Sequence, residues 1–84
     1  MKPSIRKARV RHRKRHFTVI FEPENIGYHV YCPALPGCHS EGDTHEEALK
    51  NIREAIQLYC EDLVADGEPI PDEDLIIQST AVSV

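Results

Sequence analysis

The stretch YCPALPGCHSEGDTHEEA, residues 31–48, constrains the fold of this chain more tightly than any other segment. Pro33 predicts the end of a strand, because proline has no N–H to donate to a ladder. Leu35 lies between two prolines, which predicts a buried side chain that anchors a loop. Gly37 follows Pro36, a pair that suits a tight turn. Residues 38–41 then form a short strand, which Gly42 ends.

The next segment has the signals of a helix. Thr44 is a cap residue, and Glu47 three residues later completes a capping box. Gly67 predicts the end of the helix, and the prolines at 69 and 71 prevent it from resuming. Apolar residues recur at three and four positions, giving one stripe for packing: Ala48, Leu49, Ile52, Ala55, Ile56, Tyr59 and Leu63.

Three further strands are predicted around this centre. Residues 17–22 and 28–32 alternate apolar and polar side chains, and their short connection indicates an antiparallel hairpin. A last strand is predicted from Leu75 to Val84. The order β-β-β-α-β predicts an α+β fold, a two-layer sandwich of a sheet and one helix.

Length and composition predict one small domain of 84 residues. No apolar run reaches the ~18 residues of a membrane span, so we expect a cytoplasmic protein without a membrane partner. Three cysteines are an odd number, which favours reduced thiols over a disulfide framework. Residues 1–16 hold eight of the ten basic residues and no acid, whereas residues 17–84 hold all fourteen acids. We therefore divide the chain into a basic N-terminal arm, 1–16, and an acidic domain, 17–84.

The basic arm lacks a convincing apolar period, and we expect it to be either disordered or extended, in the second case joining the first strand near its end. Its cations are candidates for contacts with nucleic-acid phosphates, although no aromatics are interleaved with them. A return onto the acidic domain and a solubilising tail are the alternatives. The candidate contacts are Arg6, Lys7, Arg9, Arg11, Arg13, Lys14 and Arg15.

The acids of the predicted helix form either a solvated face or a surface complementary to a basic partner. The candidates for that surface are Glu46, Glu47, Glu54, Glu61 and Asp62. His29, Cys32, Cys38 and His39 lack the paired spacing of zinc ligands. Cys38 and His39 are neighbours on a strand and point to opposite faces, which argues against a nucleophile and its base. We expect no catalytic residues, no metal and no cofactor.

Several motifs resemble the HicB antitoxin family. They are Glu22-Pro23-Glu24, Cys32-Pro33-Ala34-Leu35-Pro36-Gly37-Cys38, Gly42-Asp43-Thr44, Glu46-Glu47-Ala48 and Asp66-Gly67-Glu68-Pro69-Ile70-Pro71, within residues 17–71. The resemblance implies a partial ribonuclease-H-like fold without that fold's catalytic carboxylates. It also implies a homodimer or higher homo-oligomer that occludes HicA, a small basic ribonuclease toxin. The alternative is a stand-alone oligomeric nucleic-acid-binding protein that acts through the basic arm.

Overall fold

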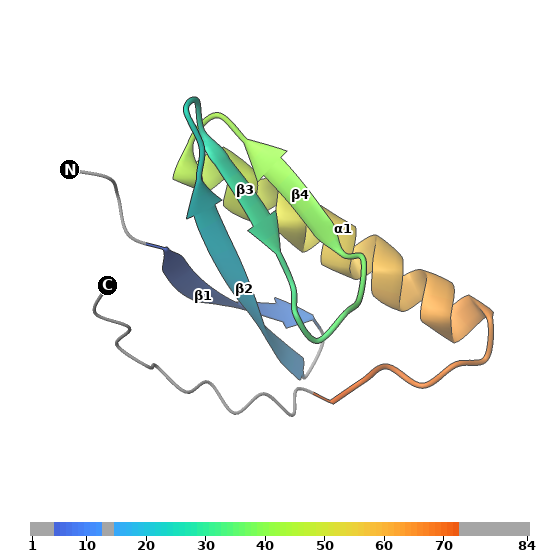
Figure 1. The fold of residues 1–84 in the computed structure, drawn as a ribbon. Helices are drawn as coiled ribbons and strands as arrows, with labels where there is room; N and C mark the ends of the chain where they lie inside the picture. The colour runs from blue at the N-terminus through green and yellow to red at the C-terminus, as the bar shows by residue number, and fades with distance from the viewer. Residues whose placement is uncertain (1–4, 13–14, 73–84) are drawn as a thin grey trace.

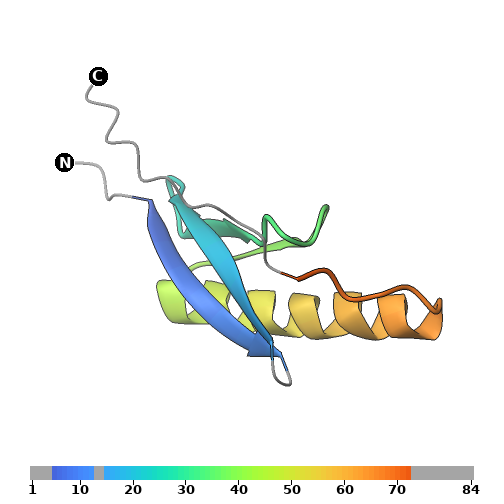
Figure 2. The same ribbon diagram turned by 90° about the horizontal axis from the view of Figure 1, so that it is seen from below.

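A computed structural model describes residues 5–12 and 15–72 of the chain. It contains four strands and one helix, which follow in the order β1 (Arg6–His12), β2 (Arg15–Pro23), β3 (Tyr28–Tyr31), β4 (His39–Gly42) and α1 (His45–Ala65). The strands form one antiparallel sheet whose spatial order is the chain order, and α1 lies across one face of it (Figures 1 and 2). This arrangement confirms the α+β class.

The basic N-terminal stretch is extended, one of the two conformations expected of it, and it pairs with β2 over a longer stretch than its end alone. Seven residues, from Arg6 paired with Phe21 to His12 paired with Arg15, form a complete antiparallel ladder with β2. Val10 lies opposite Phe17 and is only 2% exposed. The pairing satisfies the backbone of the β2 edge and buries the apolar residues between the cations, which gives this segment a defined conformation. The described part of the chain therefore runs β-β-β-β-α.

The two-residue period of the strands is confirmed. Phe17, Val19 and Phe21 of β2 are fully buried, as is Val30 of β3. These side chains face α1, whose buried residues are Ala48, Ile52, Ile56 and Cys60. Leu49, Ala55 and Tyr59 of the predicted stripe pack at the margin of this core. The core is therefore a single layer between the sheet and the helix.

The loop between β3 and β4 is built around Leu35, as predicted. The Leu35 side chain is fully buried. The Cys32 N–H donates to the Cys38 carbonyl at 3.0 Å, which closes the loop at its base. Inside it, the Leu35 N–H donates to the Cys32 carbonyl at 3.1 Å, and the Cys38 N–H donates to the Leu35 carbonyl at 2.9 Å. These bonds hold the buried side chain in place.

Both ends of α1 are capped by the expected residues. The Thr44 hydroxyl accepts from the Glu47 N–H at 3.1 Å. The Glu47 carboxylate accepts from the Asp43 N–H at 3.3 Å, one residue earlier than in the usual capping box. Gly67 has a φ of 71°, and its N–H and that of Glu68 donate to Val64 and Leu63 at 3.1 and 2.8 Å. This pattern is a Schellman motif, which requires a left-handed residue at that position.

The last predicted strand, from Leu75 to Val84, lies outside the described residues. The fit to a ribonuclease-H-like arrangement remains a prediction. Within residues 5–12 and 15–72, no helix combines the length and apolar character that crossing a membrane requires.

Candidate functional site

The two-residue period of the strands divides the basic residues between the two faces of the sheet. Lys7, Arg9 and Arg11 share the face away from α1, whereas Arg6 has the register of the buried Phe21 on the helix side. Arg15 begins β2 and forms an exposed ion pair with Asp72. Arg13 and Lys14 lie outside the described residues. The strand period therefore divides the described members of the predicted basic set between the two faces of the sheet.

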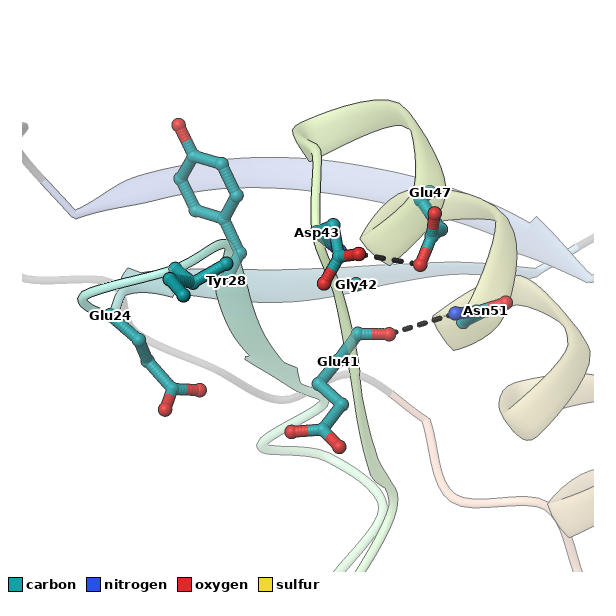
Figure 3. Close-up of a pocket in the computed structure, with 8 residues that line it drawn as sticks. Glu24, Tyr28, Glu41, Gly42, Asp43, Glu47 and Asn51 are labelled. Atoms are coloured by element: carbon teal, nitrogen blue, oxygen red, sulfur yellow. Dashed lines mark hydrogen bonds between the residues drawn. The ribbon is translucent and has the colours of Figure 1, made fainter.

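An open, acidic recess of about 440 Å³ lies where β4 meets the start of α1 (Figure 3). Four carboxylate residues line it together with an aromatic ring, an amide and one aliphatic residue. They come from the β2–β3 turn, from β3, from β4 and its junction with the helix, and from the first two turns of α1. The lining comprises Glu24, Ile26, Tyr28, Glu41, Gly42, Asp43, Glu47 and Asn51.

The walls of this recess are held by contacts to the core and the backbone. The Asn51 side-chain amide donates to the Glu41 carbonyl at 2.8 Å, which joins α1 to β4 (Figure 3). The Tyr28 ring meets the His45 ring edge to face at 5.9 Å. The His45 ring in turn packs on the ring of the buried Phe21, with the two centroids 4.3 Å apart. The recess is therefore preformed, with an aromatic wall and several negative charges.

The outer side of α1 continues the acidic surface. Glu47, Glu54 and Glu61 are spaced by seven residues, so they lie along one side of the helix. Leu58 lies between Glu54 and Glu61 on that side and is 60% exposed. Asp62 is one turn beyond Leu58 and is also exposed. We call these five residues the acidic helix face.

The structure brings together only part of the predicted acidic set. Glu46 lies about 100° around the helix from Glu47, away from the acidic helix face. Sequence reasoning missed Leu58, although its position outside the buried stripe could have identified it. It also missed Glu24, Glu41 and Asp43, which only the folded chain places beside Glu47.

Comparison with known sequences identifies the family of this chain. The sequence model of the HicB-like antitoxins of bacterial toxin–antitoxin systems matches residues 17–82. The chain belongs to the HicB-like antitoxin family. It is 53% identical over 70 residues to the UPF0150 protein ssr1765 of Synechocystis, covering 82% of this chain and 89% of that protein.

More distant sources contain similar proteins. A UPF0150 protein of Thermoplasma acidophilum is 50% identical over 56 residues, which are 66% of this chain and 81% of the relative. An uncharacterised 14.9 kDa protein of Haemophilus phage HP1 is 40% identical over 62 residues, which are 74% of this chain and 47% of the phage protein. No solved structure matches the chain.

The three thiols of this HicB-like antitoxin lie inside the fold. Cys32, Cys38 and Cys60 are buried thiols that are not joined in disulfides. Burial raises the pKa of Cys38 to about 11, and the neighbouring thiols Cys32 and Cys60 add to the shift. Cys38 is therefore protonated at neutral pH, whereas a nucleophilic cysteine needs its thiolate. His39 is exposed while Cys38 is buried, so adjacent side chains diverge as predicted.

No group of three histidine, cysteine or acidic side chains within the described ranges could hold a metal ion. The acidic recess contains carboxylates, but their distribution around an open rim does not form a coordination sphere. The arrangement suits contact with a cationic surface, since several fixed negative charges surround an exposed apolar residue and an aromatic wall.

Proposed function

We propose that this protein binds a small basic HicA-type ribonuclease toxin and blocks its access to RNA. Membership of the antitoxin family supports a toxin partner in general terms. The observation that carries the finer proposal is the acidic surface that the recess and the acidic helix face form through the residue they share, Glu47. The exposed Lys50, one turn from both Glu47 and Glu54, adds one cation beside it. A cationic toxin is the complementary partner, because opposite charges steer encounter and reject wrong partners.

Leu58 would provide the apolar centre of this contact. A leucine that is 60% exposed beside the carboxylates of Glu54, Glu61 and Asp62 has the layout of an interface anchor with a polar rim. Glu54, Glu61 and Asp62 would mainly raise the association rate, while Leu58 would slow dissociation. The Tyr28 wall of the recess offers a ring face to a partner's arginine or lysine.

The test is a binding measurement against the small basic protein encoded by the adjacent reading frame. We expect a stable complex, and co-expression should restore growth that the toxin alone arrests. Leu58→Ala should weaken the complex by tenfold or more, since a central anchor contributes on the order of 2 kcal/mol. Val64→Ala is the matched control, because Val64 is 52% exposed on another side of the same helix.

Charge variants separate the two contributions. The double variant Glu54→Gln, Glu61→Gln should slow association and reduce its dependence on salt, whereas Glu68→Gln should change neither. An absence of any basic partner, or a complex insensitive to Leu58→Ala and to the double variant, would sink the proposal. Sedimentation of the free protein tests the expected homodimer or higher oligomer.

A further inference from the structure

We propose that the sheet face opposite α1 binds single-stranded RNA, separately from the acidic helix face. The strand register defines this face. Lys7 of β1 lies opposite Ile20 of β2, which lies opposite Tyr31 of β3, which in turn lies opposite His39 of β4. Side chains in such a row point to the same side of the sheet. One line across the face therefore runs from a cation to two aromatic rings.

The cations lie along the β1 side of this face. Lys7, Arg9 and Arg11 alternate with residues that face the core, and all three are exposed. Their spacing along the strand is close to the separation between successive phosphates of an extended nucleic-acid strand. This edge can therefore neutralise the phosphates of a strand that runs beside it.

The aromatic rings lie on the opposite side of the same face. The His29 and Tyr31 rings are nearly parallel, with centroids 5.9 Å apart and an interplanar angle of 24°. His39 approaches His29 at 5.5 Å. These rings border a second recess, of about 450 Å³, whose remaining lining includes Pro33 and Pro36. A flat ring system with mostly apolar faces fits such a surface.

Cations on one side and ring faces on the other are the two requirements for a single nucleic-acid strand. Exposed bases stack on aromatic side chains, while the backbone follows a positive track. A duplex hides its base faces, which favours an unpaired strand. We commit to RNA because the imidazoles and the Tyr31 hydroxyl offer hydrogen bonds to a 2′-hydroxyl beside the stacked base.

Acidic residues restrict where the phosphate backbone of the RNA can lie on this face. The Nδ1 atom of His29 lies 3.3 Å from the Glu22 carboxylate. Glu41 lies opposite His29 in the next strand. The backbone of the RNA should therefore remain near β1 and avoid the Glu22–Glu41 row. The geometry also explains why the sequence did not reveal the site, since the rings lie far along the chain from the basic stretch.

The experiment measures fluorescence anisotropy of the full chain with a labelled twelve-residue oligouridine at 50 mM salt. Tyr31→Ala should weaken binding about tenfold and Tyr31→Phe by much less, because the phenylalanine ring preserves stacking and loses only the hydroxyl's hydrogen bond to the 2′-hydroxyl. Lys7→Gln should reduce the slope of log affinity against log salt by about 0.7, the value for one phosphate contact on a single strand. Lys50→Gln, on the helix, is the matched control. Circular dichroism establishes that each variant is folded.

Three outcomes would overturn the inference. The first is no binding at millimolar protein, and the second is binding unchanged by both Tyr31→Ala and Lys7→Gln. The third is equal affinity for oligouridine, its DNA counterpart and a duplex, which would indicate a nonspecific charge effect. Leu58→Ala should leave RNA binding unchanged, so a failure of toxin binding and a failure of this inference are distinguishable.

Discussion

Replacing Gly42 by alanine tests how closely β4 and α1 approach. A Cβ on Gly42 would clash with the backbone nitrogen of Ala48 and would lie 2.8 Å from the Ala48 Cα and the Glu47 carbonyl carbon. Ordinary contacts of a Cβ begin at 3.4 Å. Because these neighbours are helix backbone in a close-packed layer, the first turn would have to retreat by at least ~0.6 Å.

The expected loss of stability follows from what that retreat disturbs. Overpacking costs about 1–3 kcal/mol, and weakening the Thr44 cap adds about 1 kcal/mol. The bond between Asn51 and the Glu41 carbonyl, 2.8 Å long, would also lengthen. We expect Gly42→Ala to lower the free energy of unfolding by about 2–4 kcal/mol, out of the roughly 5–10 kcal/mol available to a domain of this size.

The assay is urea unfolding followed by far-ultraviolet circular dichroism, with Gly67→Ala as the control. Gly67 has a φ of +71° but no atom within 4 Å of an added Cβ. Its alanine variant should lose only the conformational term, about 1 kcal/mol. Gly27→Ala combines a φ of +81° with a Cβ only 2.8 Å from the Asp43 Cα, so it should be at least as harmful as Gly42→Ala. A Gly42→Ala stability within 1 kcal/mol of that of Gly67→Ala would refute the close approach.

Three further changes test other parts of the fold. Thr44→Ala should cost about 1 kcal/mol in urea unfolding and Thr44→Ser much less, because serine preserves the cap; equal losses would contradict this. Leu35→Ala should cost about 2–5 kcal/mol, whereas Leu58→Ala should stay within about 0.5 kcal/mol; similar losses would place Leu35 outside the core. The pKa of Cys38 rises from 9.0 to about 11 on folding. The contribution of the protonated Cys38 thiol to the free energy of unfolding is therefore complete below pH 9. It disappears as the pH rises from 9 to 11. Stability should fall over that interval by less than about 3 kcal/mol from this thiol, and Cys38→Ala should remove that part of the slope.

Local chemistry made most of the fold predictable. The residues next to Thr44 and Gly67 were enough to identify them as the two ends of the helix. The prolines around Leu35 were enough to identify it as the buried residue of the loop. The strand β2 was also predictable, because Phe17, Val19 and Phe21 have a clear two-residue period. These features depend on interactions within a few residues of the chain.

The full length of the first strand was missed because its signal is divided between two residue classes. Ala8 and Val10 alternate with Lys7, Arg9 and Arg11, which is a strand period with few apolar members. The high net charge of this segment suggested an arm outside the domain. Its conformation is decided instead by pairing with the edge of β2. The recess was missed for a different reason, since it is assembled from segments that only the hairpin turns and the helix packing bring together.

The sequential order of the sheet also bears on how the molecule folds. Each strand pairs with the one that follows it along the chain, so every hairpin can close without waiting for a distant segment. Low separation between paired residues favours rapid folding, because little loop entropy is lost before contacts form. During synthesis, the meander of β1 to β4 leaves the ribosome before α1 and can offer it a nearly complete surface (Figure 1). The helix would then act as the closing element, and its docking would set the final rate.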